Sequence, residues 1–249
     1  MLKKALALGL LAVAAAGLSA KLWSQDKTAT TRPAGAEERT YDFDGNDSLS
    51  GWTLTGEAKL DMAKGREGKG GALKVGPGGK AVVKLRDKDE SGKVDIWVYD
   101  DGTKPEDSNA NRPGPRWGIV QSDGKMLVVA ILYARYVSGS TGYTAITSDG
   151  KKWYSNLQWL GGKRTPAGWH KWTFDFDAEK GLLKILRDGK PIPTDESHWK
   201  PAESGIKGFN TIAFWGDSAE KGQTFWVADV TYTPAAAPKA AETKPAVAK

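Results

Sequence analysis

The side chains best suited to chemistry in this chain are aromatic, amide and charged groups on the polar side of alternating segments. In residues 93–99, 125–136 and 153–159, one side of a period-two pattern carries groups that stack on sugar rings or hydrogen-bond to hydroxyls. These candidate ligand-binding residues are Asp95, Trp97, Tyr99, Tyr133, Arg135, Tyr154, Asn156 and Gln158. If the three segments are neighbours in one sheet, they form a single binding surface. The alternative is that a loop or a second layer covers this face, which makes its aromatic side chains ordinary packing.

Groups for catalysis are sparse by comparison. The acidic clusters at residues 87–90, 100–101 and 195–196 adjoin turn residues, where we expect solvated carboxylates. The two histidines are His170, on an apolar strand face where a satisfied core histidine is expected, and His198, in a loop. With no cysteine and no serine in a nucleophile elbow, neither a zinc site nor a Ser/His/Asp triad is supported. The sequence therefore favours binding over catalysis.

The elements that must position these side chains are short β-strands. In residues 169–177, large apolar side chains alternate with lysine, threonine and aspartate, as in a half-buried antiparallel strand. The dipeptide Asp188-Gly189 supplies the positive φ angles of a two-residue hairpin. The predicted strands are 40–44, 51–54, 58–62, 72–75, 80–86, 94–100, 116–121, 125–135, 143–147, 153–158, 169–177, 182–187, 190–192, 209–215 and 224–232. So many strands with no convincing helix predict an all-β fold of two packed antiparallel sheets.

The two ends of the chain differ from this body. Lys3 and Lys4 precede an apolar run and then small residues up to Ala20, which is the layout of a secretory signal. The run is too short for a comfortable membrane span, so we expect no transmembrane span in the mature chain. We expect the mature protein in the periplasm, at the cell surface or secreted. An uncleaved N-terminal anchor is the alternative. The expected organisation is a signal peptide at 1–20, a flexible linker at 21–39, a β-sandwich domain at 40–233 and a disordered Ala/Pro/Lys tail at 234–249.

Composition limits the partners and the source of stability. The formal net charge is +6, but Lys3, Lys4 and the tail supply most of it, and no dense basic stripe marks the body. We therefore expect no nucleic-acid partner. The absence of cysteine excludes a lipid-modified lipoprotein, and it leaves core burial rather than disulfides to stabilise the fold.

Several segments together resemble a known family of domains. They are Tyr41 to Gly45 with Leu49 to Trp52, Val94 to Tyr99, Trp169 to Phe174, Asp188 to Ile192 and Phe225 to Val230. This set resembles the concanavalin A-like, laminin G-like jelly-roll domains of exported bacterial proteins and carbohydrate-binding modules. The resemblance implies a jelly-roll sandwich with its first and last strands side by side, often a structural calcium ion, and often a ligand on the concave sheet. The Glu-x-Asp-x-x-Glu string of the family-16 glycoside hydrolases of this fold is absent.

The resemblance also directs attention to a possible metal site between the first and last strands. Alternation places Asp229 on the same face as two apolar residues of the last strand, so its carboxylate should be partly buried and should need a partner. Asp44 and the loop residues Asn46 and Asp47 lie at the end of the opening strand, and their carboxylate and amide oxygens would suit Ca²⁺ together with the carboxylate of Asp229. The alternative is that Asp229 caps a turn or pairs with a lysine or arginine.

These observations lead to one main hypothesis of function and two alternatives. The main hypothesis is an exported, non-catalytic binding protein that recognises a glycan or another extracellular polymer. The first alternative is a divergent polysaccharide hydrolase or lyase, since this fold also hosts enzymes. The second is a structural or adhesion protein.

Overall fold

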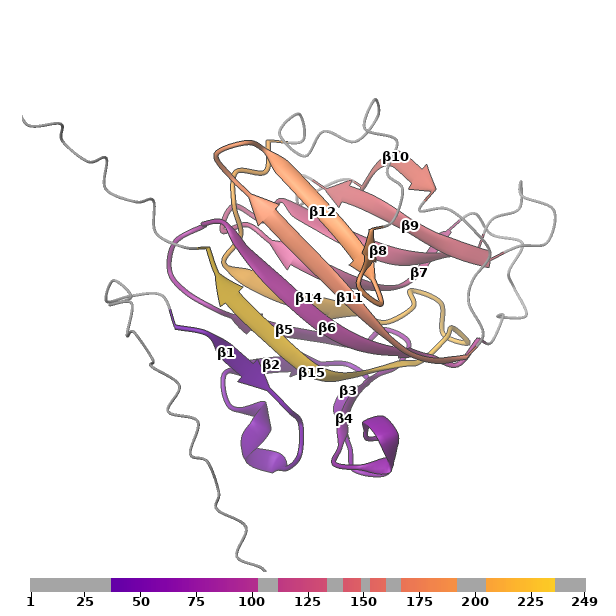
Figure 1. The fold of residues 1–249 in the computed structure, drawn as a ribbon. Helices are drawn as coiled ribbons and strands as arrows, with labels where there is room; N and C mark the ends of the chain where they lie inside the picture. Colours follow the sequence, from indigo (N-terminus) through magenta and orange to yellow (C-terminus); the bar gives the residue numbers. More distant parts are fainter. Residues whose placement is uncertain are drawn as a thin grey trace, which may run out of the picture. The chain divides into compact units, whose positions relative to one another are not determined.

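The computed structural model describes residues 37–102, 112–133, 141–148, 153–159, 167–191 and 205–235, all within the compact unit Ala34–Lys249. Almost all of these residues lie in strands or in the turns that join them (Figure 1). The exceptions are two short 3₁₀ turns, η1 (Asn46–Leu49) and η2 (Arg66–Gly68). Within the described ranges, no helix is long and apolar enough to cross a bilayer.

The strands form two antiparallel sheets, which we call sheet A and sheet B. In sheet A the order is β13 (Lys190–Pro191), β12 (Leu182–Arg187), β11 (Gly168–Asp177), β6 (Gly92–Asp100), β15 (Phe225–Pro234), β4 (Ala72–Val75) and β3 (Ala58–Asp61), and β1 (Arg39–Tyr41) also pairs with β15. In sheet B the order is β10 (Trp153–Trp159), β9 (Thr141–Ser148), β8 (Met126–Tyr133), β7 (Arg112–Val120), β14 (Thr211–Trp215), β5 (Lys80–Lys84) and β2 (Trp52–Thr55). The predicted two-sheet antiparallel sandwich is confirmed.

Each predicted strand overlaps an observed one, and the differences are at the ends. The opening strand stops at Tyr41, short of the predicted Asp44, because Phe43 has a φ angle of 55° and so leaves the β region. The Asp188-Gly189 turn has the predicted conformation, with φ angles of 53° and 76° at its two residues. Both are positive, as a type I′ hairpin turn requires.

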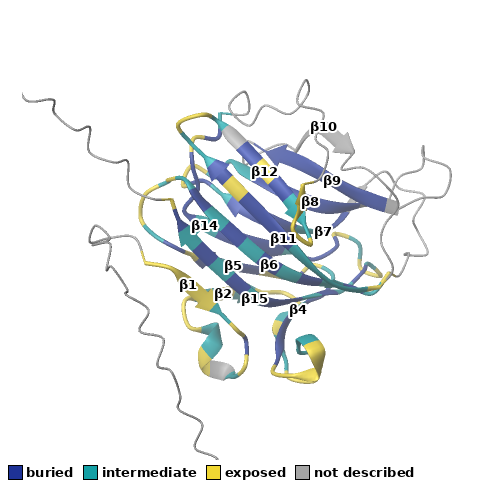
Figure 2. Cartoon of the chain, viewed as in Figure 1, coloured by how far each residue is buried: buried dark blue, intermediate teal, exposed yellow. Residues whose placement is uncertain are grey.

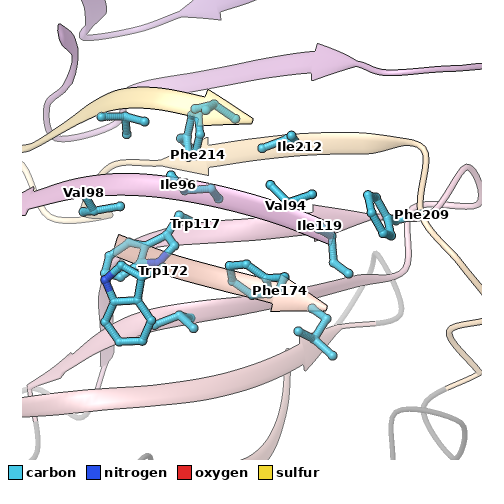
Figure 3. Packing of buried hydrophobic residues seen from close by; sticks show 14 of the residues in the cluster. Val94, Ile96, Val98, Trp117, Ile119, Trp172, Phe174, Phe209, Ile212 and Phe214 are labelled. Atoms are coloured by element: carbon cyan, nitrogen blue, oxygen red, sulfur yellow. The ribbon is translucent and has the colours of Figure 1, made fainter. Parts of the chain in front are cut away.

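The core lies between the sheets and is rich in aromatic side chains (Figure 3). Strand β6 alternates strictly, so Val94, Ile96 and Val98 are buried while the residues between them are half-buried. At the centre, Trp117 of sheet B meets Trp172 of sheet A with their ring centroids 5.4 Å apart in an edge-on arrangement. Such pairs add to the stabilisation given by burial alone, and this contact joins the two sheets directly.

The histidine predicted on the core-facing side of β11 lies at the margin of the core. The side chain of His170 is 17% exposed, and its Nδ1 is 2.9 Å from Oδ2 of Asp188 in the hairpin turn. Its place on that face and its hydrogen-bonded state agree with the prediction. No chemical role beyond fixing the turn is required to explain it.

The outer face of sheet B carries a second group of buried apolar residues, beside buried polar ones such as Thr144 and Ser148. Val128, Ala130 and Ile146 form a second cluster there, with Met126 and Trp215 packed against it. Val128 and Ala130 have no exposed surface, and Ile146 is only 2% exposed. Strands β8 and β9 are accordingly buried along both faces, whereas β6 and β15 carry half-buried positions (Figure 2).

Candidate functional site

The outer face of sheet A carries a row of three aromatic side chains that crosses three neighbouring strands. Trp169 of β11 is paired in register with Tyr99 of β6, and Tyr99 is paired with Trp226 of β15. The ring centroids of Tyr99 lie 5.4 Å from Trp169 and 5.8 Å from Trp226, both in edge-on contact. All three side chains are half-buried. We call these residues the aromatic row.

Local sequence explains why the row forms. In β6 and β15, apolar residues at alternate positions fill the core, and the pleat therefore turns the residues between them outward. In the next row along the strands, Trp97 lies between Lys171 of β11 and Ala228 of β15. The outward side chains of three central strands thus build a continuous aromatic patch.

The segment between β3 and β4 reaches over this patch with two cations. Nζ of Lys64 lies 3.7 Å from the ring centroid of Tyr99 and 5.0 Å from that of Trp226. The guanidinium of Arg66 lies 4.4 Å from the ring centroid of Trp97. These are cation–π distances, in which the negative ring face attracts the positive group.

A hydrogen bond ties the same segment to the aromatic row. Nε1 of Trp226 donates to Oδ2 of Asp61 over 2.9 Å. This bond is the main reason why the pKa of Asp61 lies below its usual value of 3.8, and a hydrogen bond from the Ala63 amide and the charges of Lys74 and Lys59 lower it further. Asp61 is therefore ionised at neutral pH and fixes the orientation of the indole.

Polar groups continue the face beyond Trp97. Asp95 accepts a hydrogen bond from Thr173 over 2.5 Å, and its carboxylate lies 3.1 Å from Nζ of Lys171 and 3.5 Å from Nζ of Lys93. Burial by itself would raise the pKa of Asp95, but the hydrogen bonds from Thr173 and Lys171 and the two lysine charges outweigh burial and lower it. The face therefore combines aromatic surface with fixed hydrogen-bonding groups.

The predicted ligand-binding residues do not share one sheet. Asp95, Trp97 and Tyr99 lie on the outer face of sheet A as predicted, but Tyr133 is on β8 and Tyr154, Asn156 and Gln158 are on β10, in sheet B. The assumption that the three segments are neighbours is wrong, because alternation fixes the face of a strand but not its place in the sheet order. Arg135 lies outside the described residues.

Sequence reasoning missed four residues of this face. Trp169 and Trp226 could have been found from the alternation of their strands, since each neighbours a core-facing residue. Lys64 and Arg66 come from a connection with no periodic signal. Only the tertiary structure brings these two cations over the aromatic rings.

The predicted calcium ligands do not come together as a carboxylate cluster. The first and last strands are side by side as expected, with Arg39 opposite Tyr232. However, Asp229 is the extra residue of a β-bulge with a φ angle of 41°, and its Oδ2 accepts a hydrogen bond from Nε of Arg66 over 2.8 Å. Asp44 and Asp47 are exposed, and no group of three or more Asp, Glu, His or Cys that could hold a metal occurs in the described part of the chain.

The partner of Asp229 is thus an arginine, in agreement with the alternative that this carboxylate pairs with a lysine or arginine. The bulge explains why Asp229 is not on the apolar face expected from alternation. An extra residue shifts the alternation and directs the side chain towards the outer face. The side chain of Asp229 is 34% exposed, so its neutralisation by Arg66 satisfies the charge without an ion.

A buried polar network lies at one end of the sandwich. Asp100 is only 2% exposed, so the expectation that it is solvated is wrong. Its carboxylate accepts hydrogen bonds from the Tyr143 hydroxyl over 2.7 Å and from Nε2 of Gln223 over 2.8 Å. Because Asp100 ends β6 and Tyr143 belongs to β9, the network joins sheet A to sheet B. Such a satisfied network rigidifies a fold.

Known proteins resemble this chain only in fold. No family model and no curated protein matches it. A CBM2 module of the evolved Dit protein of Lactobacillus casei BL23 phage J-1 aligns with a TM-score of 0.52 at 10% identity, covering 82% of this chain and 98% of that one. Domain 4 of AbnA, a GH43 extracellular arabinanase of Geobacillus stearothermophilus solved with arabinotriose, aligns with a TM-score of 0.47 at 16% identity over 80% and 92% of the chains.

A third solved structure is longer than this chain. The receptor binding domain of botulinum neurotoxin mosaic serotype C/D aligns with a TM-score of 0.46 at 15% identity over 80% of this chain. The alignment spans about half, 47%, of that domain. The CBM2 module is the one of these three with a TM-score above 0.5, and at 10% identity that similarity shows the fold alone and does not transfer a site.

Proposed function

We propose that this protein is an exported, non-catalytic binding protein that holds a glycan or another extracellular polymer on the outer face of sheet A. The observation that carries the proposal is the aromatic row Trp169, Tyr99 and Trp226, with Trp97 beside it, on a half-buried sheet face. Aromatic rings offer flat apolar surface to the faces of sugar rings. The fixed polar groups around them, such as Asp95 and Lys171, can bind hydroxyls.

The form of the face suits a chain-like ligand. The row crosses three adjacent strands, so successive units of a polymer could contact successive rings. Tryptophan and tyrosine lose little conformational entropy on binding, which makes them effective in shallow sites. The fold-level similarity to a CBM2 module supports this choice of ligand class. Export rests on the N-terminal lysines and the apolar run that follows them.

The test is a glycan-array screen of the mature protein, with a parallel assay for released reducing ends and unsaturated products. We expect binding without product release. On the array-positive glycan, Trp97→Ala and Trp169→Ala should each weaken binding about tenfold or more, as loss of an aromatic contact residue does at binding sites. Their thermal midpoints should stay near that of the parent protein, because neither side chain faces the core.

Tyr154→Ala provides the matched comparison, since Tyr154 belongs to the other sheet. If this variant loses binding while Trp97→Ala retains it, the ligand face is on sheet B and the assignment to sheet A is wrong. Release of product from the glycan would instead favour the hydrolase or lyase alternative.

A further inference from the structure

We infer that the aromatic face selects acidic polysaccharides, through positive charge gathered at its Trp226 end. This inference rests on the proposed function, and it adds the chemical class of the ligand. The groups that supply the charge are Lys59 of β3, Lys74 of β4 and Lys64 of the segment between these strands. The ligand group that they recognise is an anion on a sugar ring, either a uronate carboxylate or a sulfate ester.

The first observation concerns Lys64. Its ammonium lies over Tyr99 and near Trp226, with no ion pair in the described part of the chain. An ammonium has three donors and a compact charge, and a cation–π contact uses none of these donors in a conventional hydrogen bond. Lys64 therefore covers one face of Tyr99 itself, and its ammonium is placed to receive an anionic group of a sugar that contacts the neighbouring rings.

The second observation concerns Lys59 and Lys74. They face each other directly across β3 and β4, and Lys74 is in turn paired in register with Trp226. Like charges directly opposite each other destabilise a sheet. An anion bound between them would relieve that repulsion. The charges of both lysines lower the pKa of Asp61, and the carboxylate of Asp61 is already bonded to Trp226.

Elsewhere on the face, Lys93, Lys171 and Arg66 each have a carboxylate partner. Lys93 and Lys171 both lie beside Asp95, within 3.5 Å and 3.1 Å. Arg66 is neutralised by Asp229 at 2.8 Å and by Glu67 at 3.0 Å. Unpaired positive charge is thus local to one end of the aromatic row.

Around Trp226 the positive groups outnumber the negative ones even when Glu57, which precedes β3, is counted with Asp61. None of the three lysines lies within 4.0 Å of a carboxylate among the residues that the structure describes. The charge is therefore available to a ligand without breaking an existing ion pair, and that favours an acidic partner over a neutral one.

The experiment measures binding of the mature chain to matched acidic and neutral probes by titration calorimetry. Oligosaccharides of polygalacturonate and alginate are compared with their carboxyl-reduced forms, and dextran sulfate is compared with dextran. Single-stranded DNA serves as a polyanion without sugar rings exposed for stacking. Lys64→Gln and Lys74→Gln are the test variants. Lys80→Gln, an exposed lysine on β5 of sheet B, makes the same change of net charge away from the face.

The expected result is at least one acidic glycan bound about tenfold more tightly than its neutral form, with affinity falling as salt rises. Lys64→Gln should weaken this binding about tenfold, the range for loss of a hydrogen bond to a charged group, and Lys74→Gln should weaken it less. Lys80→Gln should leave it unchanged. Preference for dextran sulfate over the uronates would identify the anion as a sulfate ester.

Two results would overturn the inference in distinguishable ways. Equal binding of acidic and neutral forms, with Lys64→Gln unchanged but Trp97→Ala impaired, would remove the charge selection and leave the proposed function intact. Tighter binding of DNA than of any glycan, or no binding of any glycan, would reject both the proposed function and the acidic class.

Discussion

The two outer faces of the sandwich differ in a way that separates packing from recognition. On sheet A, most outward positions of β6, β11 and β15 are half-buried, and they combine aromatic rings with ion pairs. On sheet B, Val128, Ala130 and Ile146 are buried as completely as the core. The sequence already indicates this difference. Residues 126–132 form a continuous apolar run, typical of a strand buried on both faces, whereas β6 alternates.

The comparison also shows what makes a sheet face available for binding. Strand β6 directs Trp97 and Tyr99 outward, and both side chains are only half-buried, so part of their surface is open to a ligand. On β8 the outward side chains that the structure describes are those of Met126, Val128 and Ala130, which are apolar and lack strong hydrogen-bonding groups. A face of that kind stabilises the fold but offers little specificity to a ligand.

The largest expected effect comes from placing a charge on each outer face. Val128→Asp on sheet B should destabilise the protein by about 4 kcal/mol, the scale of an uncompensated buried charge. Thr233→Asp on sheet A should change stability by less than about 1 kcal/mol, since Thr233 is half-buried and lies opposite Lys93, which can pair with the new carboxylate. Equilibrium unfolding in guanidinium chloride measures both. Similar losses in the two variants would mean that the faces do not differ in burial.

A smaller effect is expected from Asp95, whose charge makes the stability of the sheet A face depend on pH. Because the pKa of Asp95 is lowered in the folded state, its contribution to stability is present above the unfolded value of about 4 and is lost as pH falls below it. Asp95→Asn should therefore be less stable than the parent by about 1 kcal/mol at pH 7. The gap should narrow as the pH falls from about 5 to 3. A gap that does not change with pH would show that Asp95 acts through packing rather than through charge.

The smallest expected effect is that of trimming the ends, because every strand that the structure describes lies between Arg39 and Pro234. A protein spanning residues 38–234 retains every strand from β1 to β15 in full. It should unfold cooperatively with the thermal midpoint of the chain from residue 21 onwards. A large fall in the midpoint would contradict the domain limits of 40–233 expected from sequence.

Sequence alone determined the strands, the hairpin turn and the inward or outward direction of each residue in β6. These features depend on local patterns, namely period two and the positive φ angles that Asp188-Gly189 accepts. The expectation for Asp100 failed because its burial depends on Tyr143 and Gln223, which are distant in the chain.

The tertiary structure alone decided which strands are neighbours and therefore which side chains form one site. Alternation gave Trp97 and Tyr154 the same kind of face, but the chain crosses between layers and places them in different sheets. The bulge at Asp229 and the cations that the β3–β4 segment lays over the aromatic rings are likewise non-local. The physical reason is that a pleat is set by each strand itself, whereas sheet order is set by long-range pairing and by the packing of the whole core.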